Sequence, residues 1–414
     1  AGVPARFVVV FWTFLGIMLV YMLRVNLSVA IIDMADQFGW DEHNSDTSGF
    51  VLSAFFIGYV FGQVPGGALS GKFGAKWVFG LGVLATGVLT FLVPITVCGS
   101  FLCPSPKPGA NGTVIPTPSS VLGIDILRIF MGMFESVTYP AMMALLSTWS
   151  PPSERSRIVS FCFSGAQVGT AIAFPLAAMI CATERGSTDP QSIFVRWPGV
   201  FHVFSLMCCA WFVGYCIFVY SSPTDHPRIS DAERRYIVDS IAGEETFGKR
   251  PVRIGQFFSS VMTNGPSLAV LAAHFTNNWA LYLMLTWMPK YMAEMLDFDI
   301  KSSGLLFIPY IVMVILANIS GSVADSLSQR LGLRSVRVLF QCTGNIIPAA
   351  AFVVLGFVSE KYTAFMIMVV AVGCSGIAYS GYSSNIIEIC PHHTGLFYGI
   401  SNTLATVPGI VAPA

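Results

Sequence analysis

The chain has 414 residues, of which 54% are hydrophobic and only 11% are charged, and its 22 Lys and Arg residues balance 22 Asp and Glu residues. An average soluble domain carries about a quarter charged residues. This composition excludes a disordered chain, a nucleic-acid-binding protein with a basic face and a soluble enzyme, and it leaves a polytopic membrane protein.

Eleven apolar segments follow one another along the chain, each long enough to cross a bilayer as a helix of about 20 residues. The last segment reaches Ala414 without a polar end, so we expect a twelfth span beyond it. The predicted fold class is therefore an all-α membrane protein. The eleven segments lie at residues 7–33, 49–70, 77–98, 121–149, 157–181, 198–220, 264–289, 303–325, 336–357, 362–388 and 395–414.

Positive charge is divided unevenly between the two sides of these spans. With the N-terminus in the cytosol, fourteen Lys and Arg residues lie on the cytosolic side and six on the other, while Arg24 and Arg128 lie within spans. Cytosolic loops of membrane proteins are enriched in Lys and Arg. The pattern predicts a multi-pass integral membrane protein with a cytosolic N-terminus, and we expect it to be a monomer.

The loop after the third span is rich in Pro and Gly and falls on the outer side. Its sequence Asn111-Gly-Thr113 matches the N-glycosylation motif, so we predict a glycoprotein with a glycan on Asn111. Cys98 and Cys103 flank the start of the same loop. Their spacing is compatible with a disulfide and equally with two free thiols.

The longest polar stretch, residues 221–262, follows the sixth span on the cytosolic side. Its Ser230-Asp-Ala-Glu233 sequence is a capping box, which predicts the start of a short surface helix. This linker divides the chain into an N-terminal bundle, residues 1–220, and a C-terminal bundle, residues 263–414.

The two halves resemble each other weakly. A glycine-rich, charged turn follows the second span at Gly66–Lys76, and a similar one follows the eighth span at Gly321–Asp325. Two six-helix bundles related by an internal repeat and joined by a cytosolic linker are the plan of a major facilitator transporter. Such folds place the substrate site near the bilayer midplane, between the halves.

Ionisable residues inside spans cost several kcal/mol unless they face a cavity or a partner. Arg24 lies in the first span, either as a structural cation paired with an acid of another span or as a fixed cation for an anionic substrate. Its guanidinium stays charged when buried and binds a carboxylate through two parallel hydrogen bonds.

The fourth span carries Asp125, Arg128 and Glu135. Asp125 and Arg128 are three residues apart and can pair, whereas Arg128 and Glu135 lie on one face, two helical turns apart. One interpretation is an internal ion pair that locks this span to a neighbour. The functional interpretation assigns anion binding to Arg128 and proton carriage to Glu135, because burial disfavours the charged carboxylate.

Several motifs resemble the family of sialin, the vesicular glutamate transporters and the sodium/phosphate-type organic anion transporters. The resemblance covers nearly the whole chain and is closest to sialin. It is carried by Arg24–Asp33, Phe55–Gly67, Gly71–Trp77, Glu135–Pro140, Trp149–Ser156, His274–Trp279, Leu285–Pro289 and Gly399–Asn402.

The resemblance implies roles for particular residues. Arg24 and Arg128 match arginines that engage the anionic substrate, Glu135 matches an acid linked to proton coupling, and three tyrosines match residues that line the cavity, namely Tyr59, Tyr139 and Tyr282. Where vesicular glutamate transporters have a His and an Arg, this chain has Leu52 and Asn277. We count Asn277 among the substrate-binding candidates.

The predicted function is secondary active transport of a small organic anion, by proton-coupled symport of an acidic sugar or similar carboxylate, in a lysosomal, vesicular or plasma membrane. Sodium-coupled phosphate or urate-type transport, glutamate loading of vesicles and an anion channel stay open as alternatives. The only coupling ion expected is H⁺, or Na⁺ in the alternative.

We find no catalytic or metal-binding motif in the sequence and expect neither an enzyme nor a cofactor. His274, in the seventh span, is expected to be a hydrogen-bonded interior imidazole.

Overall fold

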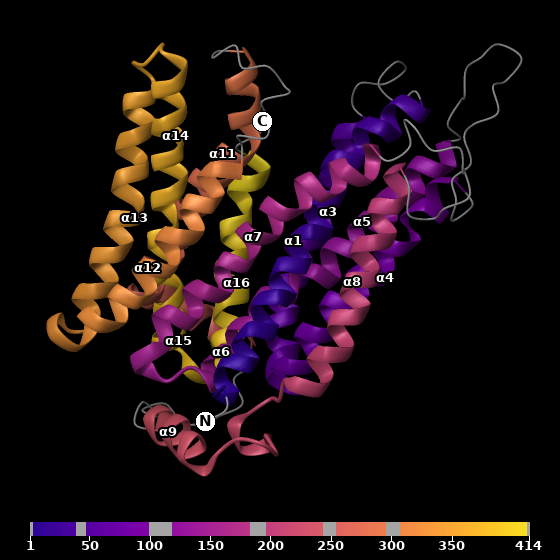
Figure 1. Cartoon of the computed structure of the whole chain (residues 1–414). Helices are drawn as coiled ribbons and strands as arrows, with labels where there is room; N and C mark the ends of the chain where they lie inside the picture. The colour runs from indigo at the N-terminus through magenta and orange to yellow at the C-terminus, as the bar shows by residue number, and fades with distance from the viewer. Residues whose placement is uncertain are drawn as a thin grey trace, which may run out of the picture.

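The computed structural model describes residues 3–38, 47–98, 118–182, 196–242, 254–294 and 307–411, and the regular structure in these ranges is helical. Figure 1 shows long helices running roughly side by side, with the N-terminus and α9 (Asp231–Ala242) at one end of the bundle and the C mark toward the other. We call the first of these the α9 end.

The helices correspond to the predicted spans. In the first half these are α1 (Ala5–Phe38), α3 (Thr47–Phe73), α4 (Ala75–Cys98), α5 (Pro118–Ser136), α6 (Thr138–Trp149), α7 (Arg155–Ala182) and α8 (Arg196–Phe218). In the second half they are α11 (Gly265–Glu294), α12 (Ile308–Leu331), α13 (Leu333–Leu355), α14 (Lys361–Ser375), α15 (Tyr382–Ile389) and α16 (Thr394–Val411). The short helix α10 (Ile254–Thr263) precedes α11 and lies almost entirely within the stretch predicted as the linker, residues 221–262.

Within the described residues, eight segments are long and apolar enough to cross a membrane. The other three predicted spans, 49–70, 264–289 and 395–414, fall on α3, α11 and α16. The predicted glycosylation site Asn111 and Cys103 lie outside the described residues. Cys98 is disulfide-bonded. The division of the chain at 220 and 263 stays a prediction.

The internal repeat is visible in two turns. Gly74 ends the turn after α3 with φ +89°, and Gly332 ends the turn after α12 with φ +77°. A residue with a side chain is strained in this left-handed region, so both turns need glycine. The second and eighth spans are therefore both followed by a glycine with positive φ.

Glycines allow the helices around the centre to pack closely. An added Cβ at Gly58 of α3 would lie 1.8 Å from the Ile129 carbonyl oxygen of α5, and one at Gly132 would lie 2.0 Å from the Phe55 carbonyl oxygen. Small residues permit such close approach of membrane helices. This contact brings Phe55 of α3 beside Arg128 of α5.

Two spans are broken in corresponding places of the two halves. The segment Leu122–Trp149 is interrupted at Val137, between α5 and α6. Pro140 lacks an N–H group and its ring collides with the carbonyl four residues earlier, which explains the break. The segment Lys361–Ile389 is interrupted by a 3₁₀ helix, η4 (Gly376–Ser380), and a turn at Gly381. Interrupted helices in matching positions of both halves mark the binding site in many transporters.

The linker packs on the α9 end through Arg6, at the start of α1. Its guanidinium lies 2.9 Å from the Glu154 carboxylate and 3.0 Å from the Glu233 carboxylate. Glu233 also accepts hydrogen bonds from the Ala5 and Arg6 backbone amides. The Ser230 hydroxyl accepts from the Glu233 amide, so the predicted cap of α9 forms.

The two halves meet at the α9 end through buried charges. Asp325 of α12 accepts hydrogen bonds of 2.9 Å from the backbone N–H groups of Ser156 and Arg157, in the first turn of α7. Glu388 of α15 pairs with Arg337 and lies 4.0 Å from Arg155. Glu388 thus pairs with arginines, whereas Asp325 binds a helix N-terminus, where free amides favour an anion.

Replacement of Asp325 by Ala is expected to open the α9 end. Two charge-assisted hydrogen bonds between the halves would be lost, each contributing about 1.5–3 kcal/mol. The distance between labels at the exposed Thr148 and Gln329 should then increase and broaden, while Asp239→Ala, on the exposed face of α9, should leave it unchanged. An unaltered distance distribution in Asp325→Ala would show that this contact does not hold the halves together.

Candidate functional site

The centre of the first half holds a buried ion pair between distant segments. Arg24 of α1 donates from Nε to Glu135 Oε1 at 2.7 Å, and its Nη2 lies 2.5 Å from the same oxygen. The Glu135 side chain is fully buried and that of Arg24 is 12% exposed. Glu135 is the second-last residue of α5, directly before the break at Val137.

Aromatic rings surround the guanidinium of Arg24. Its Cζ lies 4.7 Å from the Tyr21 ring centre, 5.1 Å from that of Phe55 and 4.6 Å from that of Tyr59. Contacts of this kind favour a cation in a dry site. Because Tyr21 is on the same helix as Arg24 and the other two rings are on α3, the cation is held by two helices at once.

Arg128 lies next to Arg24 and its rings but, unlike Arg24, is not hydrogen-bonded to Glu135 among the described contacts. Its Cζ is 5.0 Å from the Phe55 ring centre, so one ring contacts both guanidinium groups. Arg128 is 3% exposed, and its Nε and Nη1 have no hydrogen-bond partner among the described residues. The pairing with Asp125 that the spacing allows is not formed among the described residues: no ion pair joins the two, and Asp125 Oδ1 is also without a partner there. The Phe55 ring draws the guanidinium across to α3 instead.

The charges of this cluster do not cancel. Two guanidinium groups face one carboxylate, and Oε2 of Glu135 is unpartnered in the described structure. A buried unpartnered charge is costly and demands an explanation in terms of a ligand, water or function. We call Arg24, Arg128 and Glu135 the ion-pair cluster. These three residues together carry one net positive charge while Glu135 is ionised, and two when Glu135 is protonated.

A layer of aromatic side chains connects this cluster to the second half. Tyr139 of α6 is edge-on to Tyr21 and stacks on Tyr398 of α16, with centroids 6.3 and 6.0 Å apart. Phe163 of α7 contacts Tyr379 of η4 at 5.0 Å. Of these rings, only Tyr139 was among the predicted site residues. The signal for Tyr379 was its glycine-bounded segment Gly376–Gly381, which marks the second broken span.

The remaining candidates lie in the second half. His274 of α11 stacks on Tyr382 at 4.5 Å, and its Nδ1 is hydrogen-bonded to Ser401 at 2.8 Å. The prediction of a hydrogen-bonded interior imidazole is confirmed. Asn277 is 1% exposed on the same helix, and Tyr282 lies against Gly409 of α16. The Tyr282 hydroxyl lies within electrostatic range of Arg24, Tyr21 and Tyr59, so the structure brings Tyr282 near the cluster. No interaction between Asn277 and either arginine is seen among the described residues. The side chain of Leu52 lies outside the described part.

The cluster is suited to binding an anion and exchanging a proton, since it combines fixed cations, a titratable carboxyl and hydroxyl-bearing rings. Among the described residues, no group of three or more His, Cys, Asp or Glu side chains is placed to hold a metal ion.

Comparison with known proteins gives a consistent result. The family model of the Major Facilitator Superfamily matches residues 13–413. The chain is 33% identical to human sialin over 443 residues, covering 99% of this chain and 82% of sialin. It is 33% identical to vesicular glutamate transporter 3 of Danio rerio and 32% identical to human vesicular glutamate transporter 2, covering all of this chain and 67% and 68% of theirs.

The fold is similar to that of a solved transporter. The proton:xylose symporter XylE bound to 6-bromo-6-deoxy-D-glucose superposes with a TM-score of 0.71 at 14% identity, over 99% of this chain and 87% of XylE. A partially occluded, inward-open XylE from E. coli gives a TM-score of 0.60 at 15% identity, over 98% of this chain and 92% of that one. At this identity the likeness concerns the fold alone.

Proposed function

We propose, because the chain belongs to the major facilitator superfamily, that it carries an organic anion across a membrane by alternating access of its two halves, in symport with protons. The observation that carries the proposal is the buried ion pair between Arg24 and Glu135. The Arg24 guanidinium is bound by Glu135 in this structure, so a substrate carboxylate must compete with Glu135 for it.

Protonation resolves this competition. A protonated Glu135 no longer neutralises Arg24, which can then form a bidentate contact with the substrate carboxylate, while Arg128 supplies a second cation. Proton and anion therefore bind cooperatively, and each lowers the cost of burying the other in the apolar centre. Loss of the proton returns Arg24 to Glu135 and releases the anion.

An acidic sugar or similar carboxylate is the substrate class we infer. The relationship to sialin supports it. The site region also carries aromatic rings with hydroxyl groups, which can contact the apolar face of a sugar ring and hydrogen-bond its edge. The neutral Asn277, where the vesicular glutamate transporters have an arginine, favours a site with fewer cations than theirs.

The α9 end is assigned to the cytosol by the excess of Lys and Arg in its loops. Asn111 would then carry its glycan on the luminal or extracellular side. We place the protein in a lysosomal, vesicular or plasma membrane on the strength of its relatives.

The test is uptake into proteoliposomes, with pH and sodium gradients imposed separately. Labelled N-acetylneuraminate and glucuronate should accumulate in response to a pH gradient and saturate with concentration, whereas phosphate and urate should not. Accumulation driven only by sodium would replace the proton assignment. Currents far above about 10³ ions per second would identify a channel.

A further inference from the structure

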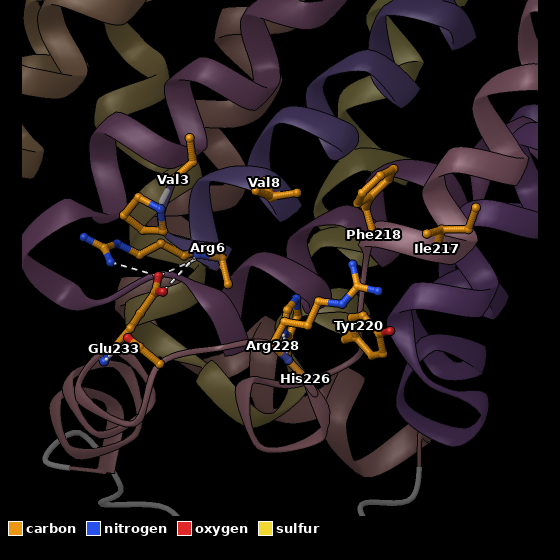
Figure 2. Close-up of a pocket in the computed structure, with 12 residues that line it drawn as sticks. Val3, Arg6, Val8, Ile217, Phe218, Tyr220, His226, Arg228 and Glu233 are labelled. Carbon is orange, nitrogen blue, oxygen red and sulfur yellow. Dashed lines mark hydrogen bonds and ion pairs between the residues drawn. The ribbon is translucent and has the colours of Figure 1, made fainter. Parts of the chain in front are cut away.

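A cavity lies at the α9 end, away from the ion-pair cluster. It has a volume of about 510 Å³ and is enclosed by the start of α1, the end of α8 and the linker that follows α8. Figure 2 shows the lining side chains. On the side of the helices the wall is apolar, formed by Val3, Val8, Ile217 and Phe218.

The cavity lies at the level where two spans begin and end. The candidate membrane spans start at Ala5 in α1 and end at Phe218 in α8. Val3, Ile217 and Phe218 are exposed by 74%, 55% and 42%, although they are large and apolar. Side chains of this kind at a helix end lie where the headgroup region meets the acyl chains. The apolar wall therefore faces lipid.

The linker side of the cavity carries an arginine, Arg228, that is not part of an ion pair among the described residues. Arg6 and Glu233 neutralise each other at one edge of the cavity, as the dashed lines in Figure 2 show. Arg228 points the other way, toward Phe218 and Tyr220. Its guanidinium forms no ion pair and no side-chain hydrogen bond in the part of the chain that the structure describes.

The neighbouring imidazole adds no charge at neutral pH. His226 Nδ1 accepts a hydrogen bond of 3.2 Å from the Arg228 backbone amide, which requires an unprotonated nitrogen. Burial also lowers the pKa of His226. Arg6 pairs with both Glu233 and Glu154, and Glu154 also pairs with Arg157, so these four charges balance. Among the described lining residues, Arg228 is then the surplus positive charge.

A cavity that is apolar toward the membrane and cationic toward water matches one class of ligand. Basic pockets beside spans on the cytosolic face bind the headgroups of anionic lipids. We propose that this cavity binds an anionic glycerophospholipid, with its phosphate on Arg228 and its glycerol and first acyl carbons against Val8, Ile217 and Phe218. A soluble phosphate would use the cation alone and leave the apolar wall without a partner.

Lipid bound there would contact α1, α8 and the linker together. Because α1 and the linker both belong to the N-terminal side of the transporter, occupancy should stabilise their docking on each other. A ligand that binds only the folded state raises the midpoint of unfolding as its concentration rises.

The experiment uses the full chain purified in mild detergent, titrated with dioleoyl-phosphatidylglycerol, dioleoyl-phosphatidylcholine or inorganic phosphate. Lipid retention is measured by native mass spectrometry and stability by thermal unfolding. Arg228→Gln is compared with Arg235→Gln, which removes the same charge from the exposed face of α9 without touching the cavity.

The unmodified chain and Arg235→Gln should retain phosphatidylglycerol in preference to phosphatidylcholine and be stabilised by it. Arg228→Gln should bind it about fivefold more weakly, as expected for one Arg near a membrane surface. Equal retention by Arg228→Gln and Arg235→Gln would overturn the proposal, and so would equal retention of the two lipids by the unmodified chain. Stabilisation by phosphate as strong as that by phosphatidylglycerol would reassign the cavity to a soluble anion. If Arg228→Gln fails to fold, the lipid comparison on the unmodified chain decides.

Discussion

Glu135→Gln is expected to abolish uptake driven by a pH gradient while leaving exchange of internal for external anion. The glutamine amide is isosteric with a protonated carboxyl and cannot lose a proton, so Arg24 stays free of its internal partner. The anion can then enter and leave with the moving halves, but nothing couples its passage to protons. Accumulation should fall to the background level of empty liposomes.

The measurement is labelled-anion accumulation and counterflow in the same proteoliposomes. Glu360→Gln is the matched control, because Glu360 is an exposed carboxylate that caps the start of α14 through Tyr362 and Thr363, and its loss should leave both assays intact. Gradient-driven accumulation at the unmodified level in Glu135→Gln would eliminate Glu135 as the proton carrier.

Arg128→Ala is expected to reduce transport by about a hundredfold at low substrate concentration. Hydrogen bonds to a charged group contribute about 1.5–3 kcal/mol each, and a bidentate contact would be lost. The free protein should lose little stability, since the guanidinium nitrogens Nε and Nη1 have no hydrogen-bond partner among the described residues. Its main described contact is the Phe55 ring.

Initial uptake rates and the thermal unfolding midpoint should be measured together. Arg128→Lys keeps the charge without the planar fork and should restore part of the rate, while Arg330→Ala, an exposed residue in the last turn of α12, should behave as the unmodified chain. Near-normal uptake by Arg128→Ala would remove Arg128 from the substrate site. A loss of both uptake and folding would point to a structural role.

The central site was only partly predictable. Arg24, Arg128 and Glu135 stand out in the sequence, because a charged residue within an apolar run of 20 residues has few explanations. The partner of each charge was not predictable in the same way. Spacing along the fourth span suggested Asp125 for Arg128, yet Phe55 contacts that guanidinium, and Glu135 pairs with Arg24, 111 residues away.

The breaks in the two spans were predictable in part. Pro140 follows Glu135 closely in the sequence, and the glycines Gly376 and Gly381 flank Tyr379. The position of each break can therefore be read from neighbouring residues. That the two breaks come together through Tyr139, Phe163 and Tyr398 depends on how the halves pack.

The sequence by itself determined where the described apolar helices lie, the linker helix and the charged residues inside the spans. These properties depend on residues within one or two helical turns and on the cost of placing polar groups in hydrocarbon. Only the tertiary structure decided which charges meet, that Asp325 binds the N-terminus of α7, and that Arg228 faces a half-apolar cavity. Such contacts join residues far apart in the chain, and no local pattern encodes the packing that brings them together.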